Sequence, residues 1–249
     1  MSLTTTASLA TKTVRELALE IPNATRVFER LGIDYCCGGT KSLEEACSAA
    51  NLPIDDVIRT LESAGEPSAT PAEHDWPSGS LAELIDHIVK THHRYTRDET
   101  ARLEPLLEKV CSVHGTNHPE LLAIRDTFGG LVEELTVHLM KEEKVLFPYI
   151  VRMEEAVLQK EPVLPSPFGT VQNPVHMMTL EHDSAGDALR RIREASQNFN
   201  VPADACISYR TLYQALDALE ADLHQHIHLE NNILFPRAIE MESRAKRGA

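Results

Sequence analysis

The chain has 249 residues, 42% of them hydrophobic, and is long enough to bury one large core or two smaller ones. Its 24 basic and 38 acidic side chains give a formal net charge of −14, which repels phosphate backbones and anionic lipid surfaces and excludes nucleic acid as an expected partner. No apolar run is long enough to span a membrane, and the N-terminus lacks the segments of a secretory signal, so we expect a cytoplasmic protein without membrane contact.

Short amphipathic segments fill the first part of the chain and predict a small helical domain over residues 1–65. The predicted helices are Val14–Leu19, Pro22–Leu31, one that opens at Ser42, and Pro53–Leu61. Gly32 is expected to end the second of these helices. Ser42 and Glu45 have the spacing of a capping box at the start of the third.

The longest irregular piece of this domain is GIDYCCGGT, residues 32–40, in which two cysteines are adjacent. A disulfide between neighbouring residues distorts the peptide bond that joins them, so we interpret Cys36 and Cys37 as a functional dithiol. The odd count of five cysteines, without C-x-x-C spacing, also favours reduced thiols. An iron or zinc site built from these cysteines alone lacks a fourth donor, and chance adjacency in a loop is the alternative interpretation.

Residues 66–80 concentrate proline, glycine and serine and predict a linker. Beyond it, residues 81–249 carry four long helical patterns joined by short turns, which predicts an all-α protein with an up-down four-helix bundle. The patterns cover Leu81–Val113, Pro119–Gln159, Pro174–Phe199 and Asp204–Arg244. Pro105, Pro148 and Pro236 lie inside three of them and should kink those helices locally.

Two of these patterns repeat one arrangement, because His138 and Glu142 recur 88 positions later as His226 and Glu230. A further histidine precedes each copy, and these two are 89 positions apart. Histidine and glutamate four residues apart share one helix face, and apolar neighbours at helical spacing place that face in the core. The complete set of four imidazoles and two carboxylates is His93, His138, Glu142, His182, His226 and Glu230.

Burying two carboxylates beside four imidazoles is costly unless a cation compensates them. Imidazole with carboxylate suits iron or manganese, and carboxylates bridge two such ions, so the set predicts a symmetric dinuclear centre with about one open or water-filled position at each metal. A hydrogen-bonded polar layer of the bundle, or histidines on its surface, is the alternative interpretation. The Glu-x-x-His pattern of ferritin-like bundles and the H-E-x-x-H pattern of zincins do not occur.

Acids stand one turn before each repeated histidine, at Glu134 and Asp222, again 88 positions apart. We expect them to accept the second N–H of a ligating imidazole or to line an ion path to the metals, a solvated or interhelical carboxylate being the alternative. His92 competes with His93 for the ligand position, and both the offset and the apolar register favour His93. Glu143 lies off the buried face and is expected to be solvated.

These residues resemble the RIC proteins, named for repair of iron centres, which join an N-terminal dithiol domain called ScdA-N to a hemerythrin-like di-iron bundle. The resemblance covers nearly the whole chain and is carried by DYCCGG from Asp34, DHI from Asp86, HLMKEEKVLFP from His138, LEHDSAG from Leu180 and LENNILFPRA from Leu229. It implies that the six histidines and glutamates bind two non-haem iron ions, oxo- or hydroxo-bridged, and that Cys36 and Cys37 are the functional thiols. Met178 and Gly186 stand one turn either side of His182, so the fifth histidine of oxygen-carrying hemerythrins is absent.

The resemblance further implies protection from nitrosative and oxidative stress through the repair of damaged iron–sulfur proteins, by iron release or by handling nitric oxide. Nitric oxide or oxygen would be the small ligands, and the chain could act as a homodimer. A carboxylate-rich shell with open positions should hold Fe(II) less firmly than a closed shell, which agrees with iron release. Two alternatives stay open: a hemerythrin-type sensor or binding protein for oxygen or nitric oxide, and an enzyme that reduces nitric oxide to nitrous oxide.

Overall fold

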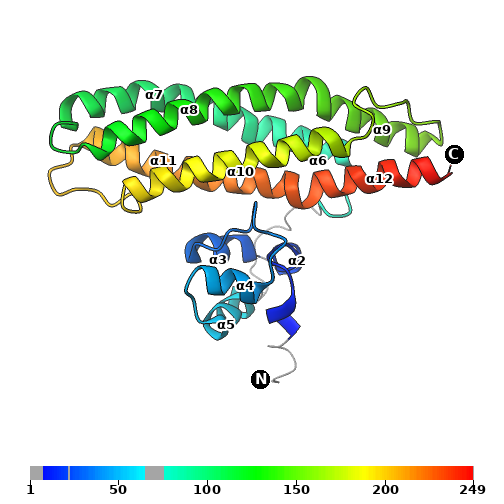
Figure 1. The fold of residues 1–249 in the computed structure, drawn as a ribbon, viewed down its shortest axis with the longest axis horizontal. Helices are drawn as coiled ribbons and strands as arrows, with labels where there is room; N and C mark the ends of the chain where they lie inside the picture. The colour runs from blue at the N-terminus through cyan, green and yellow to red at the C-terminus, as the bar shows by residue number, and fades with distance from the viewer. Residues whose placement is uncertain (1–7, 22, 65–75, 249) are drawn as a thin grey trace.

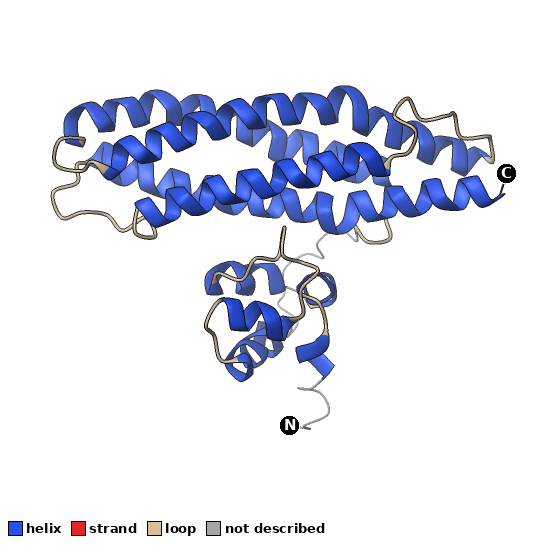
Figure 2. Ribbon diagram, viewed as in Figure 1, coloured by secondary structure: helices blue, strands red, loops and turns tan. Residues whose placement is uncertain are grey.

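The computed structural model describes residues 8–21, 23–64 and 76–248, so most of the predicted linker, 66–80, lies outside the described residues. Figure 1 shows a long helical bundle with a small helical unit beside its middle. Within the described residues there is no strand, only one isolated bridge between Thr13 and Ser42, and Figure 2 shows helices joined by loops. The predicted all-α class, with a four-helix bundle and a small N-terminal helical domain, is confirmed.

The small unit is built from short helices that begin and end on the signals seen in the sequence. They are α2 (Val14–Glu20), α3 (Ala24–Leu31), α4 (Leu43–Ala49) and α5 (Ile54–Ala64). Gly32 ends α3 with a φ of 67°, a left-handed conformation that glycine adopts without strain. Ser42 and Glu45 form the predicted capping box. The unit has its own core, in which Leu17 and Phe28 are fully buried, each contributing roughly 2 kcal/mol.

The bundle consists of antiparallel rods (Figure 1). Residues 76–248 form four of them, and three of the four contain a five-residue π-helical segment. The first rod is α6 (Leu81–Ile88), η1 (Val89–His93) and α7 (Arg94–His114); the second is α8 (Glu120–Lys141), η2 (Glu142–Leu146) and α9 (Phe147–Gln159); the third is α10 (Gln172–Ala195); the fourth is α11 (Ile207–Leu229), η3 (Glu230–Leu234) and α12 (Phe235–Gly248). These bounds match the predicted patterns to within a few residues. No described helix is long and apolar enough to cross a membrane.

Two apolar clusters hold the rods together, one on each side of a polar layer. This layer consists of buried histidine and glutamate side chains: His93, His138, Glu142, His182, His226 and Glu230. One cluster includes Leu107 and Phe128, and the other includes Leu84 and Ile150. The π-helical segments lie at the level of the polar layer, and η2 and η3 also contribute Leu146, Ile233 and Leu234 to the second cluster. Apolar packing on both sides therefore keeps bulk water away from the polar side chains.

Two of the three prolines that were predicted to kink helices follow a π-helical segment, whereas Pro105 lies within α7 and no such segment accompanies it. Pro148 lies in the first turn of α9, directly after η2, and Pro236 follows η3 in the same way. Proline has no N–H to continue the α-helical bonding, and a π turn inserts one residue into the helix. The insertion shifts the register of the helix where Glu142 and Glu230 begin η2 and η3, and such segments are frequent at functional sites.

The small unit contacts the bundle through the loop that carries the two cysteines (Figure 1). Asn232 Nδ2 in η3 donates a hydrogen bond of 3.0 Å to the carbonyl oxygen of Tyr35. A Cβ on Gly39 would lie 2.8 Å from Asn232 Oδ1 and 3.1 Å from the Tyr35 carbonyl oxygen, so a larger residue here would displace the Asn232 side chain that holds the loop. The loop is thus held against the bundle at the level of the polar layer.

Candidate metal centre

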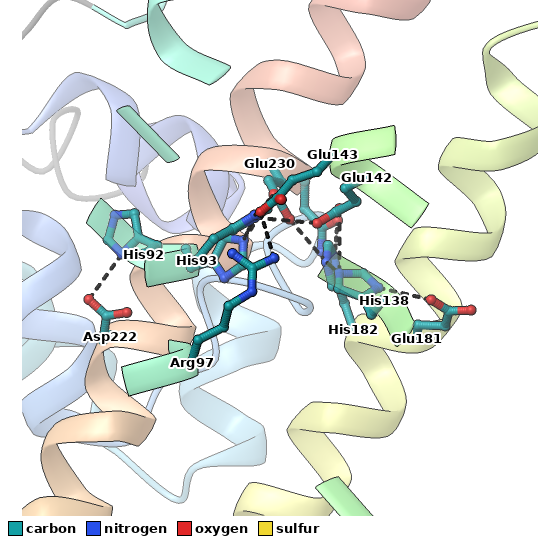
Figure 3. Close-up of polar contacts among 12 residues, drawn as sticks. His92, His93, Arg97, His138, Glu142, Glu143, Glu181, His182, Asp222 and Glu230 are labelled. Atoms are coloured by element: carbon teal, nitrogen blue, oxygen red, sulfur yellow. Dashed lines mark hydrogen bonds and ion pairs between the residues drawn. The ribbon is translucent and has the colours of Figure 1, made fainter. Parts of the chain in front are cut away.

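The structure brings the six predicted ligands together at one level of the bundle interior. Figure 3 shows His93, His138, Glu142, His182 and Glu230 pointing toward one another. The six ligands come from all four rods: His93 from η1, His138 from α8, Glu142 from η2, His182 from α10, His226 from α11 and Glu230 from η3. All six are buried, and none of these residues is more than 3% exposed. Two carboxylates buried this close together require a positive charge nearby to compensate them.

The donor atoms form two overlapping sets, in each of which all atoms lie within 4.8 Å of one another. One set is His93, His226, Glu142 and Glu230, and the other is His138, His182, Glu142 and Glu230. The Nε2 atoms of His93 and His226 are 3.1 Å apart, and so are those of His138 and His182. Two nitrogens about 2.1 Å from one metal ion, at a right angle, stand about 3.0 Å apart. Each histidine pair therefore has the spacing of neighbouring ligands on one ion.

Each glutamate belongs to both sets. Glu142 places Oε2 3.4 Å from His93 Nε2 and Oε1 3.4 Å from His138 Nε2. Glu230 places Oε1 2.9 Å from His226 Nε2 and Oε2 3.1 Å from His182 Nε2. A carboxylate that turns one oxygen to each of two sites has the geometry needed to bridge two cations.

The electrostatics of the layer also fit a metal. Burial raises the pKa of Glu142 well above its usual range, and the charge of Glu230 adds to the rise, so a nearby cation is needed to stabilise both carboxylates. Both carboxylate oxygens of Glu142 are buried without a hydrogen-bond partner among the described residues, a cost of about 1–3 kcal/mol for each group. Burial lowers the pKa of His138 to about 4 and also lowers that of His226. Neutral imidazole is the form that binds metals.

Side chains on neighbouring rods hold the second nitrogen of three of the imidazoles, as Figure 3 shows for Glu143 and Glu181. His93 Nδ1 donates to Glu143 Oε1 at 2.8 Å, His138 Nδ1 donates to Glu181 Oε2 at 2.9 Å, and His182 Nδ1 donates to Asn231 Oδ1 at 2.9 Å. Arg97 and Lys141 pair with the two acids. A hydrogen bond at Nδ1 fixes the ring so that Nε2 faces the metal position.

The predicted partners, Glu134 and Asp222, do not accept these hydrogen bonds, and that prediction is wrong. Glu134 accepts from Ser184 Oγ at 2.9 Å, and Asp222 pairs with His92 Nδ1 at 3.0 Å. The prediction that Glu143 is solvated is also wrong, because its side chain is 21% exposed and bonded to a ligating imidazole. The hydrogen bonds of the imidazoles run between adjacent rods, whereas the predictions considered only spacing within one helix. Glu134 also lines a small cavity together with three of the predicted ligands, His138, His182 and His226, and its place on an ion path stays a prediction.

The predicted dithiol lies beside this centre. Cys36 is buried and Cys37 is half-buried, and their Sγ atoms are 3.8 Å apart in free thiols. Cys37 Sγ lies 3.7 Å from the carbonyl oxygen of His182. Asn231 connects the two regions, because its Oδ1 accepts from His182 while its Nδ2 donates to the Cys36 carbonyl oxygen at 3.3 Å.

Sequence reasoning missed Asn231 and Glu181. Asn231 stands 88 positions after Glu143, the offset of the repeated ligands, so the repeat itself carried a signal for both orienting residues. Glu181 directly precedes His182 in the chain, yet it bonds to His138 on another rod. No spacing rule within one helix predicts that contact.

Comparison with known proteins agrees with this architecture. Residues 84–238 match the family model of the hemerythrin HHE cation binding domain, and residues 10–65 match ScdA_N, a domain of unknown function. The chain is 37% identical over 232 residues to the "Probable iron-sulfur cluster repair protein" of Haemophilus influenzae, covering 93% of this chain and 98% of that relative. This chain belongs to the iron–sulfur cluster repair protein family. Identity is also 37% over 224 residues to the "Iron-sulfur cluster repair protein YtfE" of Escherichia coli, covering 90% and 94% of the two chains.

The family confirms the resemblance to the RIC proteins that the motifs predicted. The chain carries a domain whose family binds cations, and its histidine and glutamate clusters fit a metal site. The matched domain spans every one of the six predicted ligands. The second matched domain contains Cys36 and Cys37.

Proposed function

We propose that the chain holds two non-haem iron ions in the bundle and acts in the repair of iron–sulfur clusters damaged by nitrosative and oxidative stress. The observation that carries this proposal is the pair of overlapping four-donor sets that share Glu142 and Glu230. Both glutamates would bridge the ions, with an oxo or hydroxo group as a further bridge. Such a centre supplies Fe(II) for transfer and open positions for nitric oxide or oxygen.

The surrounding residues favour release of iron over permanent storage. An acid behind an imidazole strengthens it as a ligand, and only His93 and His138 have one. His182 is backed by the neutral amide of Asn231, and His226 Nδ1 has no hydrogen-bond partner among the described residues. Each donor set thus combines one strengthened imidazole with one weaker imidazole.

The test replaces one bridging carboxylate. Glu142→Gln should lower bound iron well below two per chain in elemental analysis, and it should abolish restoration of activity to a [4Fe–4S] enzyme inactivated by nitric oxide. Glu133→Gln, an exposed acid on the same rod, is the matched control and should leave both unchanged. Full iron content in Glu142→Gln would refute the ligand assignment.

The same assays separate the alternatives. A sensor or oxygen store would be indifferent to the double change Cys36→Ser with Cys37→Ser, whereas repair should decline. A nitric oxide reductase would release nitrous oxide over many turnovers, which gas analysis detects. We place the activity in the cytoplasm, where the free cysteines of the chain stay reduced and damaged iron–sulfur proteins are the clients.

A further inference from the structure

A second group of possible metal donors lies outside the bundle, in the loop of the small unit. The ligand atoms of Asp34, Cys36 and Cys37 all lie within 4.8 Å of one another. The two sulfurs are 3.8 Å apart, and two thiolates about 2.3 Å from one tetrahedral ion are separated by about 3.8 Å. Asp34 Oδ1 lies 3.3 Å from Cys36 Sγ, close to the roughly 3.6 Å expected for a carboxylate and a thiolate on one such ion.

The loop holds these donors in place before any ion arrives. The backbone N–H groups of Cys36 and Cys37 donate to Asp34 Oδ1 at 3.1 and 2.9 Å, which keeps the carboxylate over the thiols. A Cβ on Gly38 would lie 2.9 Å from the Asp34 carbonyl oxygen and 3.1 Å from Oδ2, so the loop folds back this tightly only with glycine there. Donors fixed in this way lose little entropy on binding.

The group lies between the bundle centre and an open cleft. Toward the bundle, Cys37 Sγ lies 3.7 Å from the carbonyl oxygen of His182, whose imidazole belongs to the metal centre. Away from the bundle, the group opens on a cleft of about 980 Å³ between the small unit and the bundle, with Arg30, Asp187 and Arg190 among its lining residues. An ion held here would lie between the bundle centre and a cleft large enough to admit a donor from another molecule.

We infer that Asp34, Cys36 and Cys37 form a second cation site, which takes a thiophilic divalent ion such as Fe(II) or Zn(II) and leaves one tetrahedral position open. Binding replaces the two S–H bonds by metal–sulfur bonds and releases two protons to solvent, without any change of oxidation state. The inference deepens the proposed function and rests on it, because a three-donor site with an open position suits an ion in transit from the bundle to a client. A closed site of four protein donors would suit storage instead.

The experiment uses the full chain, with the bundle first loaded with iron, titrated anaerobically with Co(II) as the probe. One further equivalent should bind with an intense sulfur-to-cobalt charge-transfer band in the near ultraviolet. The bundle centre offers only nitrogen and oxygen donors and gives no such band. Absence of the band in the unaltered chain would overturn the inference.

Two variants locate the site. Cys37→Ser should abolish the band. Asp34→Asn keeps the acceptor for the loop N–H groups and should weaken Co(II) binding by about tenfold or more. Loss of a residue that only orients a metal ligand already costs about this much. Glu44→Gln and Cys206→Ser, which change an exposed acid and an exposed thiol, are the matched controls. An unchanged affinity in Asp34→Asn would remove the carboxylate from the site, and an unchanged band in Cys37→Ser would refute it.

Failure here is distinguishable from failure of the proposed function. Cys37→Ser and Asp34→Asn should retain the full iron content of the bundle, and circular dichroism checks that both remain folded. Glu142→Gln, in contrast, should lose bundle iron while keeping the cobalt band. If the band is missing but iron content and cluster repair are intact, only the second site is refuted.

Discussion

The two repeats of the metal centre supply equivalent ligands with different surroundings, and Glu143 and Asn231 show this most clearly. They occupy corresponding positions, and each accepts the Nδ1–H of a ligating imidazole, from His93 and His182 respectively. Glu143 also pairs with Arg97, whereas Asn231 donates to the carbonyl oxygen of the cysteine loop. A carboxylate cannot donate that hydrogen bond. The second repeat therefore has a neutral amide behind its imidazole, which makes a weaker ligand, and this amide also contacts the small unit.

The other pair of corresponding ligands differs in the same direction. His138 is backed by Glu181, while His226 is stacked against His92, with ring centroids 5.7 Å apart, and its Nδ1 has no partner within the described part of the chain. His92 stands 89 positions before Glu181, so an acid in one half corresponds to an aromatic base in the other. The comparison teaches that the second-repeat imidazoles are the weaker ligands, and each of the two donor sets contains one of them.

Removal of the metals should have the largest effect on stability, because it leaves the buried charges of Glu142 and Glu230 without a compensating cation. An ion present at about 1,000 times its dissociation constant stabilises the folded state by about 4 kcal/mol. For a chain of this size the melting temperature should fall by about 10 °C on chelation. Differential scanning calorimetry with and without iron measures this, and equal melting temperatures would contradict a compensating role for the cations.

Acid should destabilise the metal-free protein next most strongly. The pKa of His138 is lowered to about 4 by burial, as is that of His228 near the cysteine loop, so the unfolded chain binds more protons than the folded one between pH 6.5 and 4. The free energy of unfolding should therefore fall by a few kcal/mol as the pH drops through that window, because the lowered pKa values of these histidines outweigh the raised pKa of Glu142, which acts in the opposite direction. Urea denaturation at pH 7 and pH 5 tests the sign, and greater stability at pH 5 would contradict it.

Variants of the two orienting residues, Glu143 and Asn231, test the difference between the two repeats directly. Glu143→Gln removes the acid behind His93 and should weaken iron binding by about 10- to 100-fold. Asn231→Glu should strengthen His182 as a ligand while releasing the cysteine loop, because its carboxylate cannot donate to Cys36. Rates of iron transfer to a chromogenic chelator measure the first effect. Slower release from Glu143→Gln would reverse the assigned order of ligand strength.

A substitution at Gly39 should have the smallest effect of these changes, and it tests the contact between the cysteine loop and the bundle. Gly39→Ala places a Cβ 2.8 Å from Asn232 Oδ1 and should loosen the loop by about 1 kcal/mol or more. Gly129→Ala is the matched control, since nothing lies within 4 Å of its Cβ, and it should stabilise α8 by about 1 kcal/mol. Hydrogen exchange of the loop amides reads out the difference, and unchanged protection in Gly39→Ala would show that the close approach is dispensable.

The sequence predicted the structure best where a local pattern within a single helix, such as a cap or a residue spacing, decides the outcome. Gly32, the Ser42 capping box and the long apolar patterns predicted helix ends and rods, and the repeated His-x-x-x-Glu spacing selected six residues that the structure brings together. The π-helical segments were not predicted, because the expected kinks at Pro148 and Pro236 did not specify the inserted residue. The repeat marks Asn231 as the counterpart of Glu143, but the contacts of Asn231 and Glu181 cross between rods, and no spacing along the chain reveals which rods are neighbours.

The central claim is that both glutamates are shared between two ions. Anomalous diffraction at the iron edge, from crystals of the iron-loaded protein kept anaerobic, tests it most directly. The account predicts two iron peaks, one between His93 and His226 and one between His138 and His182, each in contact with Glu142 and Glu230. A single peak, or two peaks that do not share a carboxylate, would contradict it.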